Sequence, residues 1–261
     1  MLVDVLEYYE EIAEEYDEET KSPLMLAEDI VLFDFLREEG LIQGRVLDAG
    51  CGTGLFLDQC YWPKWGIETY MGYDFSKAML AKLCSKWPSF KNYVYPMSFL
   101  DDHDKFRDTF DLVISLYAGL NCLTRYEMSI AIKNLWSCVR PGGKLCFMTY
   151  GSIAPENRET SLHSILPQKS YAYSMVEDFV LYNWMMDLDQ VSRAVILPFS
   201  HELAKKEAPD FGGTDNLSEI TFHKNRIQED LDNAVLTGCK KGGTGSTNCS
   251  FYLCLAHKLS T

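Results

Sequence analysis

A glycine-rich turn after a short apolar segment constrains the fold of this chain more than any other feature. Val46 and Leu47 suit a buried strand, and the apolar residues from Leu55 onward suit the start of a helix. Between them every second residue is glycine, so a ligand can lie against backbone that carries no Cβ. The turn consists of Asp48, Ala49, Gly50, Cys51, Gly52, Thr53 and Gly54. A strand, such a turn and a helix in this order predict a nucleotide-type site at the carboxyl edge of a sheet.

The glycine spacing selects among the ligands that such turns bind. A pyrophosphate-binding turn needs the pattern G-x-G-x-x-G, but neither Gly50 nor Gly52 is followed by the required last glycine. The pattern D-x-G-x-G-x-G instead resembles motif I of the class I S-adenosylmethionine-dependent methyltransferases. This resemblance implies S-adenosyl-L-methionine as the cofactor and S-adenosylhomocysteine as the product; the alternative is a turn without a ligand. It implies cofactor contacts at Asp48, Ala49, Gly50, Cys51, Gly52 and Gly54.

A second strand is expected from Thr69 to Asp74, and it ends in an acid. An acid at such a strand end can accept two hydrogen bonds from a ribose diol. The segment from Asp74 to Leu80 also resembles the second motif of the family. The resemblance implies that Asp74 holds the ribose, that Phe75 lies beside the adenine and that Ser76 caps the next helix, with Met79 as a further contact. The alternative for Asp74 is an ordinary acid at a helix N-terminus.

The sequence departs from the family after the third strand, which is expected at Tyr93 to Tyr95. The family often has an acid at this point, which binds the adenine amino group. Here the chain has Ser98 and Phe99 instead. Ser98 can accept that hydrogen bond and Phe99 can flank the ring, so both are predicted cofactor contacts.

A fourth strand is expected from Phe110 to Leu116, because its residues are nearly all apolar, as in a strand covered on both faces. In the family the residues at the end of this strand face the sulfonium and the acceptor. The resemblance therefore implies cofactor contacts at Ser115, Leu116 and Tyr117. Residues 120–124 are similar to a segment of sugar N-methyltransferases and related small-molecule enzymes.

The N-terminal 40 residues are predicted to form a helical lid. Apolar and aromatic residues recur at helical spacing over residues 1–17 and again over 24–39. Residues 12–17 are similar to the leader segment of many small-molecule methyltransferases, which implies that Tyr16 closes over the cofactor. The alternative for Tyr9 and Tyr16 is packing against the sheet.

Strands alternate with helices up to Gly151, as a doubly wound Rossmann-like sheet requires. A helix is expected at 128–139, a turn at 140–144 and a fifth strand at 145–150. Residues 151–223 lack this alternation. Two strands are expected there, at 179–186 and 191–199. They predict an antiparallel cap, inserted after strand 5, that lies over the entrance to the substrate site. The alternative is a surface extension or a homodimer contact. Residues 41–150 form the predicted cofactor-binding core.

Residues 224–261 are predicted to complete the sheet with a helix at 225–236 and a last strand at 250–256. The family has seven mostly parallel strands, but its sixth strand is poorly marked here, because residues 240–247 resemble a flexible loop. The resemblance as a whole implies an α/β fold with this mostly parallel sheet.

The resemblance implies transfer of a methyl group to an oxygen or nitrogen of a small molecule. Such enzymes work mainly by alignment of the two reacting atoms, and a base is needed only for a protonated acceptor. The candidates for that base are His163, His201 and His223, and Tyr117 is a candidate for orienting the acceptor. No metal ligand set is predicted. The alternatives are a tRNA or protein methyltransferase and a non-catalytic S-adenosylmethionine-binding regulatory protein.

The amino-acid composition limits the kinds of partner that the protein is expected to bind. The formal charge of −14 and the pI near 4.8 argue against nucleic acid and anionic membranes as partners, because both are polyanions. No apolar run approaches the roughly 18 residues of a membrane span. The nine cysteines are scattered without a paired pattern, which favours a reducing cytoplasm.

Overall fold

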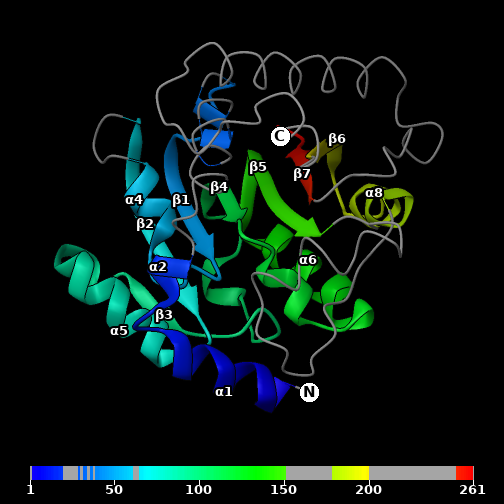
Figure 1. Ribbon diagram of the computed structural model, residues 1–261. Coiled ribbons are helices and arrows are strands. Elements are labelled where there is room, and N and C mark those ends of the chain that lie inside the picture. Colours follow the sequence, from blue (N-terminus) through cyan, green and yellow to red (C-terminus); the bar gives the residue numbers. More distant parts are fainter. Residues whose placement is uncertain are drawn as a thin grey trace, which may run out of the picture.

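The computed structural model describes residues 2–19, 29, 32–33, 36–37, 39–60, 65–150, 178–199 and 251–260. These residues form an α/β fold around a seven-stranded sheet of order β3-β2-β1-β4-β5-β7-β6 (Figure 1). The strands are β1 (Gly44–Ala49), β2 (Ile67–Asp74), β3 (Val94–Pro96), β4 (Phe110–Ser115), β5 (Val139–Tyr150), β6 (Val191–Phe199) and β7 (Phe251–Lys258). The helices are α1 (Leu2–Ile12), α2 (Tyr16–Glu19), α4 (Leu55–Gln59), α5 (Lys77–Lys86), α6 (Arg125–Cys138) and α8 (Asp178–Met186). Short 3-10 turns lie at Pro88–Phe90, Asp104–Phe106 and Gly119–Cys122.

The sheet is mostly parallel, as predicted. Strands β1 to β5 run in the same direction, and β7 pairs antiparallel with both β5 and β6. Leu112, Val113 and Ile114 of β4 are all inaccessible to solvent, which fits a central strand covered on both faces. Because β1 to β4 are parallel, their carboxyl ends meet at one edge of the sheet.

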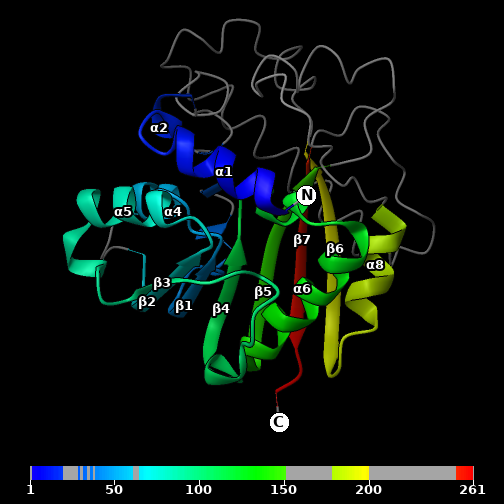
Figure 2. The same cartoon turned by 90° about the horizontal axis from the view of Figure 1, so that it is seen from below.

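Helices cover both faces of the sheet (Figures 1 and 2). On one face α4 and α5 bury Phe56 and Leu83, together with Phe33 from the part of the chain before β1. On the other face α6 and α8 bury Leu135 and Leu181. Figure 2 shows α1 lying across one edge of the sheet, between the α5 side and the α6 side.

The strand predicted at 179–186 is wrong, because this segment is helix α8. Leu181 and Met185 are both fully buried, at the i, i+4 spacing of one helix face. A short and almost continuous apolar run does not distinguish a strand from a buried helix by its periodicity. The strand predicted at 191–199 exists as β6, but it lies at the edge of the core sheet rather than in a cap.

Strand β6 is therefore the sixth strand of the sheet. The sequence pattern gave no clear strand near residues 240–247, where the sixth strand was expected. The rest of the predicted cap, 151–177 and 200–223, lies outside the described residues, as does the helix predicted at 225–236. The predicted last strand is confirmed as β7, which continues to Lys258.

The N-terminal helix ends earlier than predicted. Helix α1 stops at Ile12, a turn follows, and α2 begins at Tyr16. In one straight helix Tyr9 and Tyr16 would lie about 10 Å apart along the axis, whereas the break allows their ring centroids to approach to 6.1 Å. Of the helix predicted at 24–39, only residues 29, 32–33, 36–37 and 39 are described.

The turn predicted at 140–144 belongs to strand β5, which begins at Val139. Val139 already pairs with Phe110 of β4, and the register shifts before Lys144 pairs with Leu112. Gly142 has a φ of +75° within this irregular stretch, which explains why its residues resembled a turn in the sequence.

Replacing Thr124 by alanine is expected to lower the free energy of unfolding by about 1 kcal/mol. The Thr124 hydroxyl accepts a hydrogen bond from the backbone N–H of Glu127, and the Glu127 carboxylate accepts one from the backbone N–H of Thr124, at 2.8 Å. This capping box begins α6 and does not line the pocket described below. Denaturant unfolding measures the loss, and Thr124→Ser, which keeps the hydroxyl, should stay close to the parent protein. Equal stability of the alanine variant would contradict the cap.

Candidate functional site

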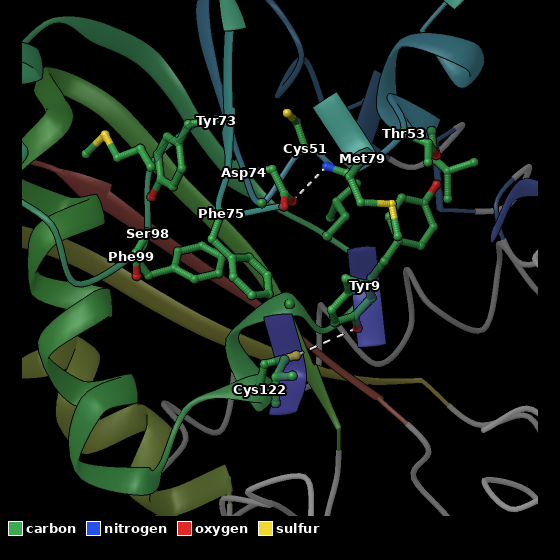
Figure 3. Close-up of a pocket in the computed structure, with 18 of the residues that line it drawn as sticks. Tyr9, Cys51, Thr53, Tyr73, Asp74, Phe75, Met79, Ser98, Phe99 and Cys122 are labelled. Carbon is green, nitrogen blue, oxygen red and sulfur yellow. Dashed lines mark hydrogen bonds between the residues drawn. The ribbon is translucent and has the colours of Figure 1, made fainter. Parts of the chain in front are cut away.

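A pocket with an empty volume of about 790 Å³ lies at the carboxyl ends of β1 to β4, beneath α1 (Figure 3). Predicted cofactor contacts on its wall are Tyr16, Gly50, Cys51, Gly52, Asp74, Phe75, Met79, Ser98, Phe99, Leu116 and Tyr117. Further lining residues are Val5, Tyr9, Thr53, Leu55, Tyr73, Met97, Gly119, Cys122 and Leu123.

The glycine turn forms the floor of this pocket. Gly50 N–H and Cys51 N–H both donate to the Tyr73 carbonyl, at 2.8 and 2.9 Å, and so hold the turn against the end of β2. A Cβ at Gly50 would lie 2.8 Å from the Phe99 ring. A Cβ at Gly52 would have no atom within 4 Å, and the φ of Gly52 is +51°. The backbone at Gly52 therefore faces open space.

Asp74 stands opposite this bare backbone, at the end of β2. Its carboxylate accepts hydrogen bonds from Gly52 N–H at 3.0 Å and from Ser76 N–H at 2.8 Å. Burial raises the pKa of Asp74 to about 6, against the opposing effect of these two N–H groups. The group is therefore mostly ionised at pH 7. Because each carboxylate oxygen can accept two hydrogen bonds, acceptor capacity remains for a ligand.

Asp48 supports the turn but does not line the pocket. It is buried at the end of β1, where the Tyr70 hydroxyl donates to its carboxylate at 2.9 Å. Burial raises the pKa of Asp48 to about 7. The structure also leaves three other predicted contacts off the pocket wall. These are Ala49, Gly54 and Ser115.

Those three positions are enclosed by the protein itself. Ala49 and Ser115 are fully buried at the ends of β1 and β4. A Cβ at Gly54 would lie 3.0 Å from the side chain of Leu83 on α5, so Gly54 allows close packing of the turn on that helix.

The wall at Ser98 and Phe99 is fixed by a buried histidine. His103 Nδ1 lies 2.7 Å from the carbonyl of Asp101, which can only accept, so Nδ1 carries the proton. His103 Nε2 then accepts from the Tyr73 hydroxyl at 3.0 Å. Burial lowers the pKa of His103, which favours this neutral form. The Ser98 hydroxyl accepts from Leu100 N–H at 3.2 Å, so part of its acceptor capacity is used within the loop.

Tyr117 is the one predicted catalytic candidate that the structure describes; His163 and His223 lie outside the described residues. Tyr117 follows the end of β4 and has a backbone φ of +56°, and the next residue, Ala118, has a φ of +57°. Consecutive left-handed residues that are not glycine are strained, and such strain is concentrated at functional sites.

The Tyr117 hydroxyl is buried and makes no hydrogen bond of standard geometry with the described part of the chain. It nevertheless lies close enough to the Asp29 carboxylate for each group to shift the pKa of the other. Burial raises the pKa of Asp29 to about 7, and burial and then the Asp29 charge raise that of Tyr117 far above its ordinary value. Tyr117 is therefore protonated at neutral pH, and Asp29 was not found from the sequence.

The N-terminal segment covers the pocket with two aromatic residues, Tyr9 and Tyr16. The Tyr9 hydroxyl lies 3.7 Å from Sγ of Cys122, and its ring packs edge-on against Phe75 at 5.9 Å (Figure 3). Helical spacing put Tyr9 on the same face as Val5 and Tyr16, but that spacing does not distinguish a packed face from a pocket wall. The sequence therefore gave no signal that Tyr9 faces a ligand site.

Residues 46–143 match the family model of a methyltransferase domain. The chain contains a methyltransferase domain. No curated protein sequence matches the chain. The domain match runs from within β1 to the first part of β5 and includes the glycine turn, Asp74 and Tyr117.

Solved structures show that this methyltransferase domain has the class I fold. Phosphoethanolamine N-methyltransferase 2 of Haemonchus contortus, in complex with phosphomonomethylethanolamine and S-adenosylhomocysteine, is similar with a TM-score of 0.59 at 13% identity; the match covers 100% of this chain and 59% of that chain. An S-adenosylmethionine-dependent methyltransferase of Archaeoglobus fulgidus has a TM-score of 0.54 at 14% identity, with 88% and 94% covered. DhpI, in complex with S-adenosylhomocysteine, has a TM-score of 0.56 at 15% identity, with 100% and 98% covered.

The pocket of the methyltransferase domain fits S-adenosylmethionine. The open space at Gly52 leaves room for a ligand against the backbone, and the Asp74 carboxylate offers acceptors for two ribose hydroxyls. Phe75 and Phe99 offer apolar ring surface for an adenine. The described residues hold no cluster of three or more His, Cys, Asp or Glu side chains suited to a metal ion. None of the described helices has the length and apolar character to span a membrane.

Binding of S-adenosylhomocysteine to the domain is expected to weaken as the pH falls through about 6. Above its pKa of about 6 Asp74 is a carboxylate that accepts hydrogen bonds, whereas below it the added proton turns one acceptor into a donor. If only the ionised form binds, Kd rises about tenfold between pH 7 and pH 5. Calorimetry across this range measures the change. Asp74→Asn, which cannot lose a proton in this range, should lose this pH dependence, and an affinity of the parent protein that is independent of pH would contradict the role of Asp74.

Proposed function

We propose that the protein is an enzyme that transfers the methyl group of S-adenosylmethionine to an oxygen or nitrogen of a small molecule. The observation that carries this proposal is the pairing of Gly52 with Asp74. Bare backbone faces open space on one side, and an ionised carboxylate stands at the end of the neighbouring strand. This is the arrangement that a nucleoside with a free ribose diol requires.

The lining residues divide into two groups along the pocket. Asp74 would hold the ribose, and Phe75, Ser98 and Phe99 would enclose the adenine. The other group lies after β4, where Leu116 and Tyr117 would face the reacting end of the ligand. Tyr9 and Tyr16 would cover the bound cofactor and exclude water from it.

Bound S-adenosylmethionine would supply a methyl group on a sulfonium, which is already a good leaving group. The protein's own contribution is then to hold the acceptor in line with that methyl group. Tyr117, protonated at neutral pH, suits orientation of an acceptor better than removal of its proton. A hydroxyl or ammonium acceptor would also need a base, for which His163 and His223 remain predictions.

A small-molecule acceptor is supported by charge and by enclosure. The formal charge of −14 opposes long-range attraction of tRNA, and the N-terminal segment covers the pocket from above. The scattered cysteines favour the cytoplasm as its location. A protein or tRNA acceptor, or a regulatory role without turnover, remains the alternative for the same cofactor site.

Calorimetry with S-adenosylmethionine and S-adenosylhomocysteine tests the proposal, with NAD as the matched control. We expect micromolar or tighter binding of the first two and no binding of NAD, because no glycine turn here fits a pyrophosphate. Release of S-adenosylhomocysteine is then measured with sets of amines, hydroxylated small molecules, tRNA and peptides. Absence of binding would contradict the cofactor assignment, and turnover only with tRNA or peptides would contradict the small-molecule acceptor.

A further inference from the structure

The N-terminal segment, residues 2–19, covers one side of the pocket, so its movement would open a path for ligand exchange. Its side chains Val5, Tyr9 and Tyr16 form part of the pocket wall, opposite the glycine turn. Figures 1 and 2 show α1 and α2 beside α5, which follows Asp74 in the chain.

Two contacts hold the segment to the first part of α5. The Glu10 carboxylate accepts from Lys77 N–H at 2.6 Å and from Ala78 N–H at 3.3 Å, where the helix dipole favours a negative charge. Glu14 pairs with Lys82 at 2.7 Å, and its side chain is 84% exposed. Exposed ion pairs of this kind contribute little.

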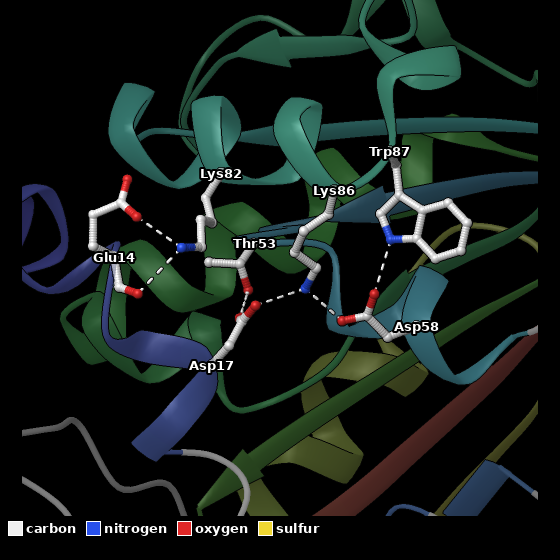
Figure 4. Close-up of polar contacts among 7 residues, drawn as sticks. All are labelled: Glu14, Asp17, Thr53, Asp58, Lys82, Lys86 and Trp87. Atoms are coloured by element: carbon white, nitrogen blue, oxygen red, sulfur yellow. Dashed lines mark hydrogen bonds and ion pairs between the residues drawn. The ribbon is translucent and has the colours of Figure 1, made fainter.

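Asp17 makes a different kind of contact, because its carboxylate joins three elements at once (Figure 4). One oxygen accepts from the Thr53 hydroxyl at 2.5 Å, and the other accepts from the Lys86 ammonium at 2.8 Å. The Asp17 side chain is only 14% exposed, and Thr53 is fully buried. The single carboxylate of Asp17 therefore links helix α2 to the glycine turn and to the end of α5.

Lys86 is itself held in place by a second acid. Its ammonium also donates to Asp58 on α4 at 2.5 Å, and the other Asp58 oxygen accepts from the Trp87 indole N–H at 2.8 Å (Figure 4). The cation that faces Asp17 is thus already positioned by α4 and α5. Charge-assisted hydrogen bonds between positioned, half-buried groups are stronger and less screened than those at an exposed surface.

We propose that Asp17 is a positioning residue: its bonds to Thr53 and Lys86 latch the N-terminal segment over the glycine turn and set the rate at which bound cofactor product leaves. Tyr16 directly precedes Asp17, so the latch fixes that ring on the pocket wall. Thr53 lies between Gly52 and Gly54, so the latch also joins the cover of the pocket to its floor. This inference rests on the proposed function, since it concerns release of S-adenosylhomocysteine.

Stopped-flow fluorescence of S-adenosylhomocysteine release tests the latch. Asp17→Ala is expected to raise the release rate about tenfold or more, because it removes the charge-assisted hydrogen bonds to both Thr53 and Lys86. Asp17→Asn, which keeps an acceptor for Thr53 but loses the charge that faces Lys86, should give an intermediate rate. Thr53→Val should also speed release, and the double variant Asp17→Ala/Thr53→Val should be no faster than Asp17→Ala alone, because both changes break the same bond.

Glu14→Gln is the matched control, because it removes a charge pair between the same segment and the same helix. Its release rate should stay within about twofold of the parent, since the pair is exposed. A release rate equally fast in Glu14→Gln and Asp17→Ala would show a general loss of charge rather than a latch, and would overturn the proposal. So would unchanged release in Asp17→Ala.

Hydrogen exchange of residues 2–19 without ligand separates the latch from the proposed function. Asp17→Ala should remove much of the protection of this segment, while the strands keep theirs. If the parent protein bound no S-adenosylhomocysteine but showed this difference, the proposed function would fail and Asp17 would still hold the segment. Equal exchange in the parent and Asp17→Ala would overturn the latch, even if the cofactor bound normally.

Discussion

Replacing Asp74 by alanine is expected to raise the Kd for S-adenosylhomocysteine by about 100-fold or more. The carboxylate would accept two ribose hydrogen bonds, and each bond to a charged group contributes about 1.5–3 kcal/mol. The change also removes the acceptor of Gly52 N–H, so the glycine turn loses one of its hydrogen bonds to the end of β2. Calorimetry on the purified variant measures the loss.

The stability of the Asp74→Ala variant has to be measured together with its binding, because Asp74 also stabilises the folded protein. Its removal leaves Gly52 N–H and Ser76 N–H without their carboxylate acceptor, at a cost of about 1–3 kcal/mol each if no water replaces it. Asp104→Ala is the matched control, because Asp104 is an exposed carboxylate outside the pocket. It should bind like the parent. A folded Asp74→Ala protein with parental affinity would show that the ribose lies elsewhere.

Most of the elements that could be predicted from the sequence were predicted from local patterns. The strands β1 and β2 could be predicted because each ends in a marked feature, the glycine turn or Asp74, and β4 could be predicted because its residues are nearly all apolar. The cap of α5 at Ser76, which the resemblance to the second family motif implied, is present, and its hydroxyl accepts from Met79 N–H. These features depend on residues that are neighbours in the chain.

Helix α8 and strand β6 could not be placed in this way. The run from Phe179 to Met186 is apolar on nearly every side, so neither a period of two nor a period of 3.6 stands out. What makes it a helix is the tertiary position of Leu181 and Met185 against α6 and the sheet. The role of β6 as an edge strand likewise depends on its pairing with β7, which comes more than fifty residues later in the chain.

The site shows the same division between local and distant information. The glycine turn and Asp74 were found because one motif carries each of them. The contact of Tyr9 with Cys122 spans 113 positions, and that of Asp17 with Thr53 spans 36, so no spacing rule connects either pair. Asp29 was missed because its significance depends on burial beside Tyr117, which the sequence does not report.

Replacing Gly52 by alanine is expected to weaken cofactor binding strongly while it leaves the fold intact. The new Cβ would meet no protein atom within 4 Å, so packing is not disturbed. The φ of +51° would cost about 1–2 kcal/mol for a residue with a Cβ. The methyl group would instead occupy space that the ligand needs, and we expect Kd to rise about 100-fold, as for the loss of several close contacts.

Gly40→Ala separates backbone strain from occupation of the pocket. Gly40 has a similar φ of +59°, and a Cβ there would also meet nothing within 4 Å, but it lies before β1 and away from the pocket wall. Both variants should lose similar stability in thermal unfolding, and only Gly52→Ala should lose binding of S-adenosylhomocysteine. If both variants bound like the parent, no ligand would lie against Gly52. If both lost binding equally, strain in the backbone rather than occupied space would be the cause, and Gly52 would not be part of the ligand site.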